Sequence, residues 1–238
     1  EILFGQYRRH RAHTQQTLAE LLREARTQLG PCRLQVKITG SGSLNLGKAM
    51  DIAFVQEVVA VASSLERVAP QTDVAIELGG EDAKIIYFRG GLEQRMNGVC
   101  AGGTGSFIDQ MASLLQTDAQ GLNQAAADYQ EIYPIAARCG VFAKTDIQPL
   151  LNQGVAKEDI IAGVHFSVAA KACALAQRVG VRDAVVLTGG VGQNSGVADA
   201  IQKELGQRIL VARDPQLTGA LGAALLAYEE QMRKEKSA

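Results

Sequence analysis

The sequence has no tryptophan, only 6 phenylalanines and 5 tyrosines, and almost no excess of charge of either sign. Because 24 lysines and arginines stand against 25 acidic residues, no basic field is available to hold a phosphate backbone, and we expect no nucleic-acid partner. No apolar run approaches the roughly 20 residues of a membrane span, so we expect no membrane association. The 238 residues, 47% of them hydrophobic, are enough for one large domain or two small lobes around an aliphatic core.

The chain has no C-x-x-C pair, and its four cysteines, Cys32, Cys100, Cys139 and Cys173, are widely scattered. Since secretory features are also lacking, we expect a cytoplasmic protein with reduced thiols. We interpret Cys32 and Cys173 as small buried side chains. The chain begins at Glu1 rather than at a methionine, and we expect it to be part of a longer protein.

Helix-like and strand-like segments alternate along the chain, which predicts an α/β architecture. Helical patterns cover residues 14–29 (with Thr14 as N-cap), 51–65, 106–115, 121–128, 147–151, 157–179, 197–205 and 218–232. Strand patterns cover residues 2–7, 34–38, 74–76, 83–88, 184–187 and 208–211. Glycine clusters at the turns between these segments.

The first informative turn is residues 77–82, with the sequence ELGGED, between two expected strands. A diglycine turn lets backbone N–H groups approach an anion closely. The flanking carboxylates are suited to holding Mg²⁺ through water or to orienting water on a phosphoryl group. The alternative is a hairpin with surface acids. Lys84 lies inside the outgoing strand and is no Walker lysine, because the chain has no GxxxxGK[ST].

Two further turns precede helices. Residues 100–106, with the sequence CAGGTGS, place Cys100 before a helix N-terminus, which lowers a thiol pKa and suits metal ligation. Cys139, beside a glycine, repeats the arrangement, and a plain buried thiol is the alternative for both. Residues 188–194, TGGVGQN, follow a buried strand and open a helix, as in a nucleotide site. The small residues 218–224 allow close helix packing.

Taken in order, these segments resemble the BadF/BadG/BcrA/BcrD family of ATP-dependent activators of 2-hydroxyacyl-CoA dehydratases and benzoyl-CoA reductases, within the actin/hexokinase/Hsp70 superfamily. Residues 77–84 resemble its second phosphate motif, D-I-G-G-Q-D-x-K. Residues 97–107 and 139–146 resemble its two cysteine motifs, the second usually C-x-V-F-A-x-[ST]-[DE]. Residues 188–194 are similar to the adenosine motif and 219–224 to the second connecting helix.

The resemblance implies an actin-like ATPase (ribonuclease H-like) fold of two lobes, with ATP and Mg²⁺ in the cleft between them. The first lobe would be residues 1–72 completed by the helix 218–238, and the second 73–217. The implied catalytic residues are Glu77, Glu81 and Asp82. The implied nucleotide-binding residues are Gly79, Gly80, Lys84, Gly103, Thr104, Gly105, Gly189, Gly190, Asn194 and Gly222.

The resemblance also implies a homodimer in which Cys100 and Cys139 of both protomers hold one [4Fe–4S] cluster. ATP hydrolysis would rotate the helices that carry this cluster and deliver one low-potential electron to a CoA-ester dehydratase or reductase. The donor would be reduced ferredoxin or flavodoxin. Four thiolates satisfy such a cluster.

Two departures from the family pattern matter. Glu77 and Glu81 stand where the second phosphate motif usually has Asp and Gln. The first phosphate motif, D-x-G-S-T-x-x-K, is absent from the chain, so we expect poor Mg-ATP turnover by this chain alone. Three rival readings stay open: a cluster-free small-molecule kinase of the same superfamily, a nicotinamide-binding domain around residues 190–196, and a non-catalytic nucleotide-sensing module.

Overall fold

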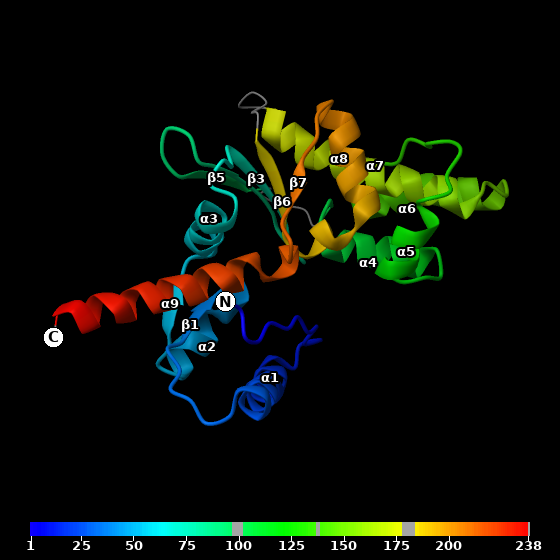
Figure 1. Ribbon diagram of the computed structural model, residues 1–238. Helices are drawn as coiled ribbons and strands as arrows, with labels where there is room; N and C mark the ends of the chain where they lie inside the picture. Colours follow the sequence, from blue (N-terminus) through cyan, green and yellow to red (C-terminus); the bar gives the residue numbers. More distant parts are fainter. Residues whose placement is uncertain (97–101, 137–138, 178–183, 238) are drawn as a thin grey trace. The chain divides into compact units, whose positions relative to one another are not determined.

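The computed structural model describes residues 1–96, 102–136, 139–177 and 184–237. The chain divides into two compact units. Unit 1 comprises Glu1–Pro70 and Leu217–Ala238, and unit 2 comprises Gln71–Gln216. Figure 1 labels the helices and strands of both along the chain.

Unit 1 contains helices α1 (Thr14–Leu29), α2 (Leu44–Ala49), α3 (Glu57–Val68) and α9 (Thr218–Ser237) and the parallel strands β1 (Lys37–Thr39) and β2 (Ala53–Val55). Helices α3 and α9 pack directly on each other. Gly222 of α9 is buried against α3, and a Cβ there would overlap the carbonyl of Ala60. Only glycine allows this approach of two helix backbones. The structure therefore gives Gly222 a packing role within unit 1.

Unit 2 is built on a sheet that has, in the described residues, the strand order β5-β4-β3-β6-β7. The strands are β3 (Val74–Leu78), β4 (Ala83–Tyr87), β5 (Glu93–Met96), β6 (Val185–Thr188) and β7 (Leu210–Val211). Strands β3, β6 and β7 are parallel, whereas β4 pairs antiparallel with β3, and β5 antiparallel with β4. Every residue of β3, β4 and β6 is buried, and β5 is an exposed edge. Such continuous burial explains their apolar runs.

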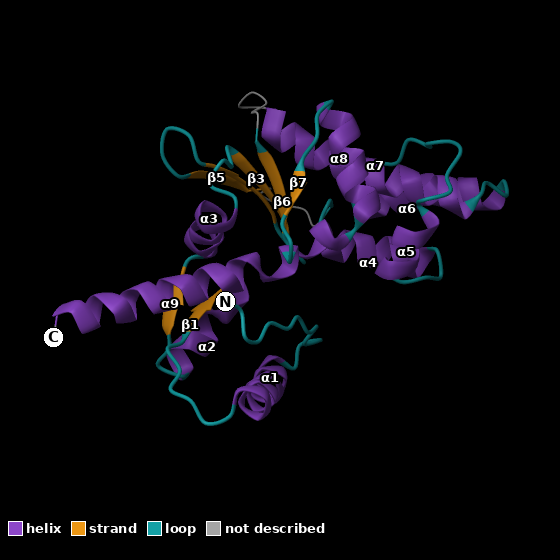
Figure 2. Ribbon diagram, in the orientation of Figure 1, coloured by secondary structure: helices purple, strands orange, loops and turns teal. Residues whose placement is uncertain are grey.

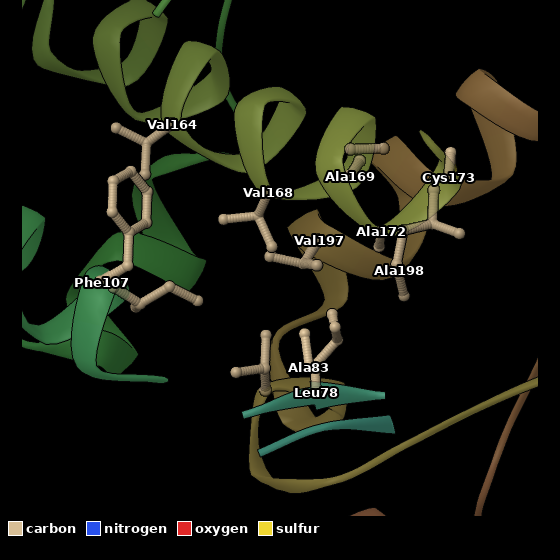
Figure 3. Close-up of a cluster of buried hydrophobic side chains, with 14 of the residues drawn as sticks. Leu78, Ala83, Phe107, Val164, Val168, Ala169, Ala172, Cys173, Val197 and Ala198 are labelled. Carbon is tan, nitrogen blue, oxygen red and sulfur yellow. The ribbon is translucent and has the colours of Figure 1, made fainter. Parts of the chain in front are cut away.

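The helices of unit 2 are α4 (Gly105–Leu114), α5 (Ala119–Ala125), α6 (Gly140–Asn152), α7 (Lys157–Gln177) and α8 (Ser195–Leu205). Figure 2 shows them in purple beside the orange strands of the sheet. One hydrophobic core joins them to β3, β4 and β6. Figure 3 shows part of this core, with side chains of α7 and α8 next to those of the sheet: Val168, Ala172, Val197, Ala198, Leu78 and Ala83. The core sets the position of α7 and α8 relative to the strand ends.

Helix α7 is apolar on most of its surface. Among the described residues it is the one helix long and apolar enough to cross a membrane by length and composition, over Lys157–Ala176 with a mean hydropathy of 1.4. The expectation that no apolar run approaches this length is therefore wrong for α7. Since 67% of the apolar window is buried inside the structure, α7 has the burial of a core helix. Burial also raises the pKa of its Cys173 thiol to about 12.

Several element predictions are wrong in detail. Residues 2–7 form no strand in the described chain, and residues 53–55, expected to be helical, form β2. The helix expected over 147–151 begins at Gly140. The N-cap of α1 is His13 rather than Thr14. Short apolar runs fit a strand and a buried helix equally well, and this ambiguity accounts for the error at β2.

Candidate nucleotide and thiol sites

Two of the predicted glycine turns lie side by side at the carboxyl ends of parallel strands. Strands β3 and β6 pair in parallel with Glu77 opposite Thr188, so Gly79 and Gly189 both follow strand ends at one edge of the sheet. Gly189 has a φ of +87°, and a Cβ there would overlap the carbonyl group of Leu78. Only glycine meets both demands. Crevices outside the carboxyl ends of parallel strands are the usual ligand sites of open α/β sheets.

The third turn is bonded to the first. The amides of Gly105 and Ser106, at the start of α4, donate to the carbonyls of Gly79 (2.9 Å) and Gly80 (2.7 Å). These two amides are thus engaged in hydrogen bonds inside the protein. Gly105 instead serves close approach, because a Cβ there would lie 3.2 Å from the Cα of Gly80.

Next to this junction, Gly103 and Thr104 are held deep in the fold. Gly103 has a φ of +83°, and Thr104 is fully buried. The stem of Lys171, on α7, lies against Gly103 and would be 3.2 Å from a Cβ there. Sequence reasoning missed this lysine, which places a positive side chain beside the glycine turn.

The acidic residues around the first turn differ in environment. Glu77 and Lys84 are directly opposite on β3 and β4 and both buried, with the Lys84 Nζ 3.5 Å from a Glu77 carboxylate oxygen. The same Nζ lies 3.7 Å from half-buried Asp82. Glu81 is exposed at the turn. Lys84 thus lies between the carboxylates of Glu77 and Asp82, and Glu81 adds a third carboxylate at the same turn.

The glycine turns also leave room for a ligand. A Cβ added at Gly80 or at Gly190 would meet no atom within 4 Å, although the neighbouring Gly79 and Gly189 are closely packed. The backbone at these two positions is therefore open to the close approach of a phosphate or a nucleoside.

Asn194 closes the second turn as the N-cap of α8. Its Oδ1 accepts a hydrogen bond from the Val197 amide at 3.1 Å. Its Nδ2 lies 3.2 Å from Nε2 of His165, on α7. The next two residues of α8 are held by Asn123, whose Oδ1 accepts from the Ser195 hydroxyl (2.9 Å) and the Gly196 amide (3.2 Å).

Sequence reasoning missed His165 and Asn123. His165 is 1% exposed, and burial lowers its pKa to about 4. The signal was a lone histidine in an otherwise apolar helix, but the sequence does not show which residue it faces. Asn123 gave no signal, since an asparagine in a short helix is ordinary.

Cys139 lies at the N-cap of α6, at the positive end of the helix dipole, and its exposure is intermediate. The next two side chains, Val141 and Phe142 of the first turn, are 70% and 63% exposed. Cys100 lies outside the described residues. Within the described ranges, no three His, Cys, Asp or Glu side chains form a group that could hold a metal ion.

Two carboxylates hold the segment that leads into Cys139. Asp146, on α6, accepts from the amide of Ala136 at 2.8 Å. Asp159, at the start of α7, accepts from the amides of Gln130 and Glu131 at 2.7 and 3.0 Å. Charge-assisted bonds of this kind are stronger than neutral ones, so the approach to Cys139 is tied to both helices.

A parallel core with an antiparallel extension, and glycine turns at the ends of β3 and β6, define an actin-like ATPase fold, as the sequence predicted. The solved structure of the activator of the 2-hydroxyisocaproyl-CoA dehydratase from Clostridium difficile with bound ADPNP superposes with a TM-score of 0.86 and 35% identity. The match covers 92% of this chain and 84% of that one.

The sequence profile of the BadF/BadG/BcrA/BcrD ATPase family matches residues 5–227, and the chain belongs to this family. It is 37% identical over 205 residues to the 2-hydroxyisocaproyl-CoA dehydratase activator of Clostridioides difficile, covering 85% of this chain and 76% of that one. It is 42% identical over 163 residues to the (R)-2-hydroxyglutaryl-CoA dehydratase activating ATPase of Acidaminococcus fermentans, covering 68% and 63%. The predicted family and fold class are confirmed, and the family is one of ATPases.

Proposed function

We propose that this ATPase activates a CoA-ester dehydratase or reductase by delivering a low-potential electron from a [4Fe–4S] cluster shared by two copies of the chain. Relatives named as activators of such dehydratases support the partner class. The observation that carries the electron-transfer step is Cys139 at the N-cap of α6, beside exposed apolar side chains.

The position of Cys139 suits a ligand of a negatively charged cluster. A helix N-terminus stabilises negative charge on the sulfur and on the inorganic core, and α6 is 13 residues long. One chain offers two cysteine motifs, at Cys100 and Cys139, so two copies supply the four thiolates that a cubane needs. When bound, the cluster supplies one-electron chemistry at low potential.

The exposed first turn of α6 supports a homodimer. Val141 and Phe142 present apolar surface next to the thiol, and a two-fold axis would place the same surface of the second copy against it. Such a contact would remove both side chains from water and shield the thiolates from solvent.

At the other site, the chain's own residues would bind and orient Mg-ATP. The open backbone at Gly80 and Gly190 receives the nucleotide, and Glu81 and Asp82 hold the water shell of Mg²⁺. Glu77, which pairs with Lys84, would orient the attacking water. We expect the protein to work in the cytoplasm with reduced ferredoxin or flavodoxin as donor, free of nucleic acid and membrane.

Anaerobic reconstitution with iron and sulfide tests the cluster. The wild type should bind about four irons per two chains, with a visible charge-transfer band and an EPR signal after reduction. Cys139→Ser and Cys100→Ser should abolish both signals, because each removes two of the four ligands. Cys32→Ser is the matched control and should bind iron like the wild type. Cys32 lies outside both motifs and is exposed, so the interpretation of Cys32 as a buried side chain is wrong.

A wild-type protein that hydrolyses ATP but takes up no stoichiometric iron would contradict the proposal. That result would favour a cluster-free kinase of the same superfamily. Full iron binding by Cys139→Ser would also contradict it, because the cluster would then have other ligands.

A further inference from the structure

The side chain of Asn194 is engaged at both ends inside unit 2. Its Oδ1 caps α8 through the Val197 amide, and its Nδ2 faces His165 Nε2 at 3.2 Å. Asn194 is only 8% exposed. A side chain held in this way acts on the structure around it, so its contribution to a nucleotide site would come from the backbone that it places.

The bond to Val197 also decides the state of His165. An amide N–H donates to Oδ1, so the NH₂ group of Asn194 points at the histidine, and Nε2 has to accept. His165 therefore carries its proton on Nδ1. A charged imidazolium would put an N–H against the NH₂ group, and burial, which lowers the pKa of His165 to about 4, keeps the ring neutral at pH 7.

This histidine has a cost to the fold. Its Nδ1 has no hydrogen-bond partner in the described parts of the chain, and the atom is buried. An unsatisfied buried donor destabilises the native state. A leucine of similar volume would avoid that cost but would leave the NH₂ group of Asn194 without its acceptor. The histidine therefore stabilises the structure by accepting the hydrogen bond of the Asn194 NH₂ group.

Gly196 adds a second contact between His165 and the start of α8. A Cβ at Gly196 would overlap the Nδ1 edge of the ring, so the first turn of α8 lies directly on the imidazole. Helices α7 and α8 pack side by side, as Figure 1 also shows. With Asn123 holding Ser195 and Gly196 from α5, side chains of two other helices fix this helix start.

We propose that His165 is a positioning residue of the nucleotide site, which holds the amide of Asn194 and through it the turn of residues 189–193 in the conformation that receives ATP. The proposal rests on the assignment of that turn to the nucleotide site. Asn194 itself is then a positioning residue rather than a nucleotide contact. Loss of the acceptor at Nε2 should weaken ATP binding without changing the chemical step.

Three variants at one position separate these roles in the full-length protein with Mg²⁺. In His165→Gln the side-chain oxygen reaches the place of Nε2, whereas His165→Asn is too short and His165→Leu has no acceptor. We expect ATP Kd and KM to rise about tenfold in the Asn and Leu variants and by less than about threefold in the Gln variant, with kcat unchanged. Isothermal titration and steady-state hydrolysis measure these quantities, and thermal melts measure stability.

A fourth variant tests the site assignment itself. Gly190→Glu fits the fold, because a Cβ there meets nothing within 4 Å, but it puts a charged side chain where the nucleotide would lie. It should abolish ATP binding while the melting temperature stays close to that of the wild type. Wild-type ATP affinity in Gly190→Glu would overturn the inference together with the site assignment.

Wild-type affinity in His165→Leu, with Gly190→Glu inactive, would overturn the positioning role alone. Equal weakening in the Gln, Asn and Leu variants would also overturn it, because the acceptor would then be irrelevant. Should His165→Leu fail to fold, Asn123→Ala provides the second test, since it removes the other side chain that holds the start of α8. Asn123→Ala should raise the Kd for ATP several-fold. An unchanged Kd would count against the proposal. None of these readouts involves iron, so they are independent of the cluster.

Discussion

Helices α8 and α6 begin at two of the motifs that the sequence analysis identified. The side chains around these two helix starts differ in their hydrogen bonding. The start of α8 is capped by Asn194, braced by His165 and Asn123, and buries Val197 and Ala198. The start of α6 has a cysteine at its N-cap, and the Cys139 side chain makes no capping hydrogen bond.

The two helix starts also differ in their apolar surface. All 13 residues of α6 are described, and it buries Ala143 and Ile147 while exposing Val141 and Phe142. A polar, internally satisfied helix start positions a turn for a small ligand. A helix start with a half-buried thiol and exposed apolar neighbours is suited to a shared interface. Under the proposed function, this difference would keep nucleotide chemistry and electron transfer at separate places in one fold.

The largest expected effect concerns the exposed first turn of α6. Phe142→Asp removes an exposed aromatic side chain and adds a charge, and a two-fold axis applies the change twice. We expect the dimer Kd to rise at least about 100-fold, because burying one phenylalanine contributes about 1.5–3 kcal/mol. Analytical ultracentrifugation of the reconstituted protein measures this value.

Val68→Asp serves as the control for that experiment. Val68 is a similarly exposed apolar residue, at the end of α3 in unit 1, and its replacement should leave the dimer unchanged. A Phe142→Asp protein that associates as tightly as the wild type would show that this turn of α6 is not an interface.

The second expected effect concerns His165, beside the start of α8, and the pH dependence of the free energy of unfolding. The folded-state pKa of His165, about 4, lies below its ordinary value of 6.5, so the unfolded chain binds a proton more readily. Its contribution is fully present above pH 6.5 and is lost as the pH falls towards 4, by at most about 3 kcal/mol. Urea unfolding of the wild type at pH 7, 5.5 and 4.5 should show this loss.

His165→Gln should lose correspondingly less stability over the same pH range, since glutamine does not titrate. The matched control is His10→Gln, which makes the same replacement at an exposed histidine. Identical pH profiles for the wild type and His165→Gln would contradict the assignment of a buried neutral ring.

The smallest effect concerns the segment before Cys139. Asp146→Ala removes the acceptor of the Ala136 amide and should loosen this segment, raising the rate of Cys139 alkylation about threefold to tenfold, as expected when one hydrogen bond is lost. Asp146→Asn keeps an acceptor oxygen and should alkylate at nearly the wild-type rate. Peptide-resolved mass spectrometry of the iron-free protein follows Cys139 alone, and equal rates in both variants would remove the role assigned to Asp146.

Local chemistry made parts of the fold predictable. The β3–β4 hairpin, the long helix α7 and the cap of α8 follow from apolar runs, a diglycine turn and an asparagine before a helix. Strand β5 escaped prediction because its four residues are exposed and show no alternation of apolar and polar side chains. The early start of α6 was not predicted because the polar run Lys144–Asp146 interrupts the apolar pattern of its first turns.

In the candidate sites, too, some features could be predicted from the sequence and others could not. The glycine turns and the cysteine motifs could be located from the sequence because turn conformation and helix starts depend on neighbouring residues. The engagement of the first α4 amides by Gly79 and Gly80, and the meeting of Asn194 with His165, could not. These contacts join residues about 25 to 30 positions apart, and no local pattern specifies such a pairing.

The sequence by itself therefore determined the α/β class and the ATPase family, and it located the motifs for which we propose nucleotide and thiol chemistry. The tertiary structure decided which polar groups face a ligand and which are used internally. The physical reason is that hydrogen-bond satisfaction in a buried site is a property of all the helices and strands packed around it. A sequence motif identifies the residues of a site. The packing of α7 against α8 determines which polar atoms of those residues form hydrogen bonds with each other.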